Sequence, residues 1–153
     1  MSEVRVAADG DFAAVGRLLD DFNREYDDPT PGPEVLAGRL RRLVRGGDTA
    51  VLLIGATPDG IAVLRLRPAI WSEALECYLA ELYVVPVRRG RGLGRTLLLA
   101  AMDHAAQLGA DYMDLGTSED DVAARRLYES LGFSNREGKP DGPINYYYER
   151  RLP

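Results

Sequence analysis

Hydrophobic and polar residues alternate along this chain with two periods, one typical of β-strands and one typical of amphipathic helices. The period of two, or a short continuous apolar run, predicts strands at residues 4–8, 50–56, 61–66, 76–85, 111–115, 133–136 and 144–150. The period of 3.6 predicts helices at residues 9–26, 34–45, 92–108 and 121–131. The order of these elements favours a mixed sheet with helices on its faces.

Glycine and proline mark the ends of these elements. Residues 27–33 contain three prolines, which fix φ and lack an N–H group, so the first helix cannot continue through them. Residues 58–60, Pro-Asp-Gly, are a turn signal that makes the flanking strands an antiparallel hairpin. Since neither a repeat nor a linker interrupts this succession, we expect one domain over residues 1–153.

Composition and charge narrow the class of protein. The 153 residues are 46% hydrophobic and 28% charged with a net charge of −5, which argues against a general nucleic-acid binder and favours a soluble cytoplasmic protein. No apolar run approaches the roughly 20 residues that span a bilayer, and the first residues lack a secretory signal, so we expect no membrane partner.

One cysteine and one histidine, Cys77 and His104, exclude an internal disulfide and a Cys/His zinc cage, so no metal is expected. We interpret them as a buried thiol and as a packed or surface histidine.

The segment 82–98 carries the strongest chemical signal, because a strand stops at Pro86 and a loop rich in arginine and glycine leads into an apolar helix. Gly90, Gly92 and Gly94 permit positive φ and let a ligand approach the backbone. The N–H groups that begin the helix attract an anion. Basic side chains add charge to an otherwise acidic chain; they are Arg88, Arg89, Arg91 and Arg95. The pattern predicts a site for a phosphate or pyrophosphate group.

Two nucleotide-binding motifs do not fit this loop. The dinucleotide fingerprint G-x-G-x-x-G lies in the first strand–helix turn of its fold, whereas here Gly-x-Gly-x-Gly follows antiparallel strands past the middle of the chain. A P-loop requires Gly-Lys-Ser/Thr, and the sequence has no such triplet. A nucleotide-binding regulatory domain is therefore the least favoured class of function.

Two blocks resemble the GNAT superfamily of N-acetyltransferases. Residues 89–94, Arg-Gly-Arg-Gly-Leu-Gly, are similar to the (Arg/Gln)-x-x-Gly-x-(Gly/Ala) acyl-CoA signature, and residues 124–133 resemble the A-x-x-L-Y-x-x-x-G-F helix and turn. The blocks stand in the family's order, and the resemblance covers nearly the whole chain. It implies an α/β fold of the α+β type, with about four helices on a mixed, mostly antiparallel sheet of six or seven strands. We expect this sheet to splay between the strand ending near Val85 and the strand starting near Asp111.

The resemblance implies transfer of an acetyl group from acetyl-CoA to a primary amine by direct attack in a ternary complex. The strand end would pair with the pantetheine arm, and the loop and first helical turn would hold the pyrophosphate. The residues implied for cofactor binding are Leu82, Tyr83, Val84, Arg89, Gly90, Arg91, Gly92, Leu93, Gly94, Arg95 and Thr96. In the family a strand N–H polarises the thioester oxygen, a role that the resemblance gives here to Val84.

Two residues are implied for proton transfer. Tyr128 stands where many family members have a tyrosine near the CoA sulfur, and as general acid it would protonate the departing thiolate; packing of its helix is the alternative role. Glu81 is the candidate general base, because only the free amine attacks a thioester and Glu81 lies on the strand leading to the cofactor loop. A solvated residue and an amine-binding anion are the alternatives for Glu81, and Glu76 is the second candidate base.

The chain departs from the resembled patterns at two positions. Residues 78–84 resemble the same strand of diamine acetyltransferases, which carry two adjacent acids, but Ala80 stands in place of the first. Asp121 stands where the family often has an asparagine. We interpret Asp121 as serving the helix N-terminus rather than the pantetheine arm.

Acidic residues gather at the end of the first predicted helix and in the loop after it. They are Asp20, Asp21, Glu25, Asp27 and Asp28. In the resembled fold this region borders the acceptor cleft, so we expect it to concentrate a small cationic amine such as a polyamine, an aminoglycoside-like sugar amine or an amino-acid derivative. A peptide amine as acceptor and a merely solvated helix end are the alternatives.

A non-catalytic acyl-CoA-binding or sensor domain is the alternative to an enzyme, and Tyr128 and Glu81 argue against it. Homodimers are common in the superfamily, which is the only ground for expecting a dimer here. Residues 146–148, three consecutive tyrosines on the last predicted strand, fit either an acceptor site or a dimer contact.

Overall fold

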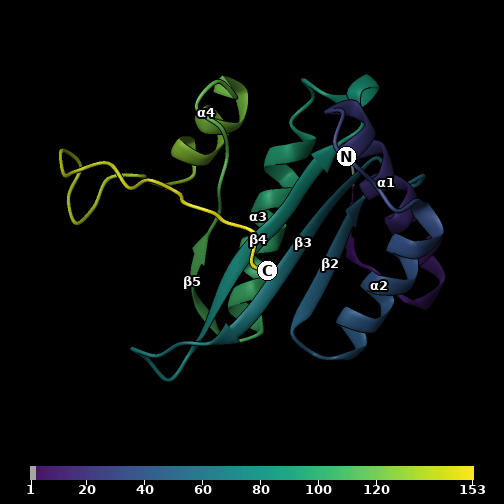
Figure 1. The fold of residues 1–153 in the computed structure, drawn as a ribbon, viewed down its shortest axis with the longest axis horizontal. Helices are drawn as coiled ribbons and strands as arrows, with labels where there is room; N and C mark the ends of the chain where they lie inside the picture. Colours follow the sequence, from purple (N-terminus) through teal and green to yellow (C-terminus); the bar gives the residue numbers. More distant parts are fainter. Residues whose placement is uncertain (1–2) are drawn as a thin grey trace. The chain divides into compact units, whose positions relative to one another are not determined.

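The computed structural model describes residues 3–153 and comprises two compact units, one reaching Met113 and the other Asp114–Pro153. The first unit is built on an open sheet of five strands. In their order across the sheet they are β1 (Val4–Val6), β2 (Thr49–Ile54), β3 (Gly60–Pro68), β4 (Leu75–Val84) and β5 (Ala110–Asp114). Strands β1 to β4 are antiparallel neighbours, whereas β5 runs in the direction of β4, so the sheet is mixed (Figure 1). The Leu75 N–H donates to the Gly109 carbonyl (3.0 Å), which joins the starts of β4 and β5.

Helices cover both faces of this sheet. Figure 1 shows α1 (Phe12–Glu25) and α2 (Pro33–Arg45) on one face and α3 (Leu93–Gln107) on the other. Short 3-10 turns, η1 (Asp9–Asp11) and η2 (Pro86–Arg88), precede α1 and α3. Because both faces are covered, every residue of β2 is buried, and its sequence is a continuous apolar run rather than an alternation.

The core between the sheet and helices α1 and α2 draws on every second residue of the central strands. Its buried members include Phe12, Val15, Leu18, Leu19, Leu40, Val51, Leu53, Ile61, Val63 and Tyr83. Gly16 allows the two helices to pack closely, because a Cβ at this position would lie 2.1 Å from the Pro33 carbonyl oxygen. The side chains of the alternate residues face α3.

A β-bulge at Ala80 changes which side chains of β4 face which helix. Val63 pairs with Glu81, but the next residue of β3, Leu64, pairs with Leu79, so Ala80 is the extra residue. Glu81 therefore shares the α1–α2 face with Val63, whereas Leu79 shares the α3 face with Leu64. Strict alternation would have placed both on one face. The bulge thus turns the Glu81 carboxyl group toward the side covered by α1 and α2.

The second unit contains α4 (Val122–Ser130), and its described residues form no strand after Asp114. The predicted strands at 133–136 and 144–150 are therefore wrong, and the sheet has five strands rather than six or seven. Only an isolated antiparallel bridge forms there, between Arg136 and Ile144. A proline at position 143 cannot donate to a ladder, and the three tyrosines that follow are exposed, so no buried face stabilises a strand.

Candidate functional site

The start of α3 has the form of an anion site. Gly90 and Gly92 have φ angles of 77° and 78°, and a Cβ added to either would meet no atom within 4 Å. No side chain caps the helix, and the N–H groups of Leu93 and Gly94 have no acceptor within it. Arg95 lies exposed in the same turn. Backbone N–H donors and the positive end of the helix dipole thus lie together, and the two glycines leave the space beside them free of side chains. This arrangement suits phosphate oxygens.

Some main-chain groups in the predicted cofactor loop already have partners. The Arg89 N–H donates to the Pro86 carbonyl (3.2 Å), and the Thr96 N–H and hydroxyl both donate to the Gly92 carbonyl (3.0 Å each). Arg91, by contrast, is exposed, and its side chain forms no ion pair with any residue in the range 3–153. The candidate backbone donors are therefore confined to the residues between Arg89 and Thr96.

The end of β4 presents main-chain groups in two directions. The Val85 N–H donates to the Asp59 carbonyl (2.8 Å), so the main-chain groups of Val85, and of Tyr83 two residues earlier, point toward β3. Those of Leu82 and Val84 point away from β3, toward the β5 side of the strand. The N–H of Val84, the predicted thioester donor, lies on that side.

Glu81 is a partly buried carboxyl group on the α1–α2 face of β4. It forms no ion pair or hydrogen bond with another residue in the part of the chain that the structure describes. Burial raises the pKa of Glu81 above its ordinary value of 4.5, because the charged form loses hydration. Glu76, the second candidate base, forms an ion pair with Arg67, its neighbour across the β3–β4 ladder. Glu81 thus has the properties of a general base, and Glu76 is occupied by a partner.

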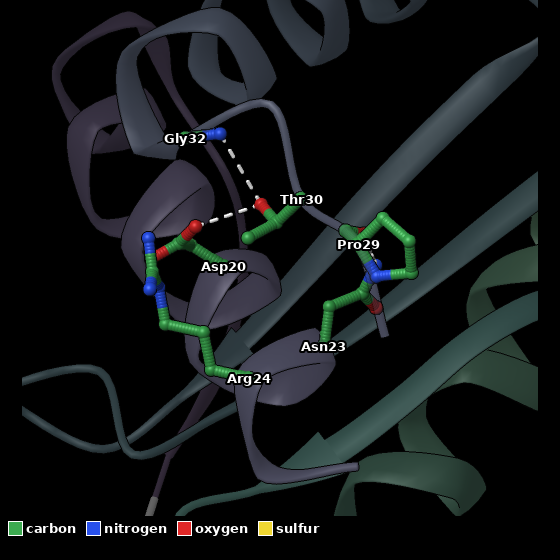
Figure 2. Close-up of polar contacts among 6 residues, drawn as sticks. All are labelled: Asp20, Asn23, Arg24, Pro29, Thr30 and Gly32. Carbon is green, nitrogen blue, oxygen red and sulfur yellow. Dashed lines mark hydrogen bonds and ion pairs between the residues drawn. The ribbon is translucent and has the colours of Figure 1, made fainter. Parts of the chain in front are cut away.

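The acidic residue deepest in α1 holds the loop between α1 and α2 in place. Figure 2 shows the buried Asp20 carboxylate accepting a hydrogen bond from the Thr30 hydroxyl (2.7 Å) and pairing with Arg24 (2.8 Å). Nearby, the Asn23 side-chain amide donates to the Pro29 carbonyl (2.7 Å). The hydrogen bond from Thr30, followed by that from Arg24, holds the pKa of Asp20 below 3.8. Asp20 therefore serves the loop rather than an incoming amine.

Glu25, the last residue of α1, forms a two-point ion pair with Arg89, in which Nη1 and Nη2 each lie 2.7 Å from a carboxylate oxygen. Arg89 Nε donates to the Val84 carbonyl (2.9 Å), and the guanidinium lies 5.5 Å from the centroid of the Tyr83 ring. The Tyr83 hydroxyl donates to Glu25 (3.3 Å), and its ring stacks on Phe22 at 4.8 Å between centroids. The hydrogen bonds from Arg89 hold the pKa of Glu25 below 4.5.

This ion pair was not predicted from the sequence. Glu25 and Arg89 are 64 residues apart, and no local pattern connects an acid at a helix end with the first residue of a glycine-rich loop. Two of the five acidic residues, Asp20 and Glu25, therefore have basic partners. The other three are exposed and form no ion pair within residues 3–153; they are Asp21, Asp27 and Asp28.

In the second unit, the cap structure of α4 fixes the position of Tyr128 within that unit. The Asp121 side chain accepts from the Ala124 N–H (3.1 Å), which confirms its predicted role at the helix N-terminus. Gly132, with φ of 91°, turns the chain so that the Phe133 N–H donates to the Tyr128 carbonyl (3.0 Å) and the two rings meet edge to face. Burial, and then the charge of Asp121, raise the pKa of Tyr128 above 10.

The remaining residues that were singled out have structural positions. Cys77 is a buried thiol, as predicted, and His104 lies partly buried in the last turn of α3. Across residues 3–153, no three side chains of His, Cys, Asp or Glu come together as a metal-binding group. None of the helices described is both long and apolar enough to cross a membrane.

Comparison with known proteins gives both a family match and relatives. The Acetyltransferase (GNAT) family model matches residues 15–133. The uncharacterized N-acetyltransferase YhfO of Bacillus subtilis (strain 168) is 31% identical over 140 residues, covering 88% of this chain and 91% of YhfO. The mycothiol acetyltransferase of Gordonia bronchialis is 38% identical over 86 residues, which are 51% of this chain and 28% of that longer protein.

Crystal structures with the same fold cover nearly the whole chain. One, an Arthrobacter sp. FB24 protein assigned to the acetyltransferases, is 42% identical with a TM-score of 0.87, covering 97% of this chain and 96% of its own. The aminoglycoside acetyltransferase meta-AAC0020 from an uncultured soil metagenomic sample has a TM-score of 0.76 at 16% identity, covering 98% and 97%, which shows a shared fold alone. The partial similarity of residues 78–84 to diamine acetyltransferases stays a prediction.

Proposed function

Because the chain belongs to the Acetyltransferase (GNAT) family and is a GNAT-type N-acetyltransferase, we propose that it transfers an acetyl group from acetyl-CoA directly to the amino group of a small cationic amine. The attack takes place in a ternary complex. Both units belong to one acetyltransferase domain, in keeping with a family match that extends over residues 15–133. The uncapped start of α3, with its two open glycines, is the observation that carries the proposal.

Acetyl-CoA fits the residues at the start of α3. A pyrophosphate needs several donors close together and no side chain in its way, and this loop offers N–H groups between glycines whose Cβ positions are open. On the side away from β3, the end of β4 offers main-chain groups that pair with the pantetheine arm as they would with an added strand. When bound, acetyl-CoA supplies the acetyl group as a reactive thioester. The residues proposed to form its binding site, by direct contact or by holding the loop, are Leu82, Tyr83, Val84, Arg89, Gly90, Arg91, Gly92, Leu93, Gly94, Arg95 and Thr96.

The N–H of Val84 is the proposed donor to the thioester oxygen. Arg89 already occupies the carbonyl of the same residue, so the N–H is the main-chain group of Val84 left for a ligand on that side of β4. A donor that is in place before negative charge develops needs no reorganisation. Such a donor contributes about 3 kcal/mol to transition-state stabilisation.

Glu81 is the proposed general base and Tyr128 the proposed general acid. An amine with a pKa near 10 is mostly protonated at neutral pH, so the nucleophile must lose a proton before or during attack. The raised pKa of Glu81 makes it a stronger base than an ordinary carboxylate, and no bound partner must first be displaced. The raised pKa of Tyr128 keeps its phenol protonated and able to donate to the departing thiolate.

A cationic acceptor is supported by the acids that have no basic partner. Asp21, Asp27 and Asp28 are exposed near the end of α1, in a chain whose net charge is −5. Their field favours capture of an amine cation. Mycothiol acetyltransferases are among the relatives, so small-molecule acceptors belong in the set of substrates to be tested.

The test is release of the CoA thiol from acetyl-CoA across polyamines, aminoglycosides, amino acids and short peptides. We expect saturable release with one class of small cationic amine, and KM for that amine should rise between 50 and 500 mM salt because screening weakens electrostatic capture. Saturable release with peptides alone would make a peptide amine the acceptor. Binding of acetyl-CoA without turnover on any amine would instead favour a sensor domain.

A further inference from the structure

The ion pair between Glu25 and Arg89 connects two segments that the proposed reaction uses separately. Glu25 ends α1, next to the acids proposed to attract the amine, and Arg89 opens the loop proposed to hold the pyrophosphate. The two bonds of 2.7 Å leave both guanidinium Nη atoms directed at one carboxylate. This planar, two-point geometry fixes direction as well as distance.

Arg89 also reaches the end of β4. Its Nε donates to the Val84 carbonyl at 2.9 Å, so a single guanidinium joins the end of α1, the end of β4 and its own loop. Tyr83 closes the cluster, because its ring lies under the guanidinium and its hydroxyl donates to Glu25. Phe22, one turn before Glu25, stacks on the same ring. Four side chains thus hold the last two residues of β4 against α1.

From this geometry we infer that Glu25 and Arg89 are a pair of positioning residues: they fix the Val84 peptide and the start of the cofactor loop to α1, and so couple the amine side of the enzyme to the acetyl-CoA side. The inference rests on the proposed function for the identity of both ligands. The Arg89 side chain then acts as an internal support for the loop and makes no contact with phosphate itself. Neither residue of the pair touches the reacting atoms.

A coupled pair has a distinct signature in a double-mutant cycle. We expect Glu25→Ala and Arg89→Ala each to lower kcat/KM for acetyl-CoA roughly tenfold, and the double variant to lower it roughly tenfold as well, rather than a hundredfold. Arg89→Lys should resemble Arg89→Ala more than the wild type, because an ammonium cannot reach both Glu25 oxygens and the Val84 carbonyl. Glu34→Ala removes an exposed acid at the start of α2, outside the proposed site, and is the matched control, expected to leave KM for acetyl-CoA unchanged.

Hydrogen–deuterium exchange gives a second readout that needs no turnover. Loss of either member of the pair should speed exchange of the amides in residues 84–92, whereas Glu34→Ala should not. Multiplicative effects in the cycle, or exchange in residues 84–92 that matches the wild type, would overturn the inference. If the wild type binds acetyl-CoA but acetylates no amine, the proposed function fails, and the same cycle measured on acetyl-CoA affinity still decides whether the pair positions the loop.

Discussion

Two corners of the first unit are built from the same kinds of segment but differ in how the first turn of the helix is satisfied. The α1–α2 corner comprises the end of α1, the loop after it and the start of α2; the β4–α3 corner comprises the end of β4, its loop and the start of α3. Both helices begin at a glycine with positive φ, 100° at Gly32 and 78° at Gly92. In α2, however, Pro33 removes one N–H donor and Glu34 offsets the helix dipole, whereas α3 has no acid in its first turn.

Two carboxyl groups repeat this contrast. Asp20, in the α1–α2 corner, has a hydroxyl and a guanidinium as partners, and its pKa is lowered. Glu81, on β4, has neither, and burial raises its pKa. The chain satisfies its polar groups where they only hold structure and leaves them unsatisfied where a ligand is expected.

The largest effect is expected from Glu81→Gln, which should lower kcat by a hundredfold or more if Glu81 is the base. In the wild type, kcat should rise with pH through an acidic limb above 4.5, the ordinary pKa of a glutamate, and the variant should lack this limb. A carboxyl whose pKa is raised by folding loses its contribution to stability as pH rises through that pKa, so the variant should melt at a higher temperature at pH 8. An unchanged pH–rate profile would remove Glu81 from the mechanism.

Asp20→Asn is the matched control for Glu81→Gln. It removes the charge from a carboxyl group that has partners, so its effect on stability at pH 8 should have the opposite sign, with a lower melting temperature. The activity of the folded enzyme should change little. If both variants shift the melting temperature in the same direction at pH 8, the presence of hydrogen-bonding and ionic partners does not distinguish Asp20 from Glu81.

Gly16→Ala should destabilise the protein by about 3 kcal/mol, because the added Cβ meets the Pro33 carbonyl oxygen at 2.1 Å and the helices must separate. Gly38→Ala is the matched control in the interior of α2, where the nearest atom to a Cβ is the Arg42 guanidinium at 3.7 Å. That substitution should stabilise the helix by about 0.5–1 kcal/mol. Thermal unfolding measures both, and equal destabilisation would contradict the close packing of α1 against α2.

Arg95→Glu would make the start of α3 resemble that of α2. An acid in this turn replaces the positive side chain, so KM for acetyl-CoA should rise about 30-fold through the lost charge-assisted contact with the pyrophosphate. The reciprocal variant, Glu34→Lys, should weaken α2 slightly and leave KM for acetyl-CoA unchanged. An Arg95→Glu enzyme with a normal KM would place the pyrophosphate elsewhere.

The smallest effect concerns the Glu25–Arg89 pair at acid pH. Because Arg89 lowers the pKa of Glu25, the pair stabilises the fold above about pH 4.5, and that stability is lost as the pH falls through the lowered pKa. Both side chains are partly exposed, so we expect at most about 1 kcal/mol. Chemical denaturation of the wild type and Glu25→Gln between pH 7 and pH 3 should show their difference shrinking toward zero. A constant difference would mean that the carboxylate charge is not what stabilises the wild type.

Much of the fold followed from periodicity and turn residues. The four helices and the first five strands lie close to their predicted bounds, because Gly and Pro end most of them and an apolar face or a continuous apolar run defines each. The last two strands were wrong because local strand propensity in residues 144–150 counts for little without a face to bury. The bulge at Ala80 was missed as well, since a single extra residue leaves no mark in an apolar strand.

The candidate site was predictable where it depends on the backbone and not where it depends on distant side chains. Positive φ at Gly90 and Gly92 and the helix start after them are local properties of the loop. The roles of Asp20 and Glu25 depend on Thr30 and Arg89, whose positions are set by the packed fold. The sequence therefore predicted an acidic cluster, and only the structure separated its paired members from its unpaired ones.

After the bulge at Ala80, the side chains and the main-chain groups of β4 are directed at right angles to each other and can serve two different ligands. Downstream of it, the Glu81 side chain projects from the face of the sheet, while the main-chain groups of Leu82 and Val84 lie in the plane of the sheet. Any residue except proline supplies the same main-chain donor, so the edge tolerates mutation in a way that the face does not. Related enzymes built on such a strand can change their amine by altering side chains on the face of the sheet, and keep unchanged the main-chain groups proposed to meet the thioester. Divergence in acceptor without loss of the acetyl donor is the evolutionary outcome that this geometry favours.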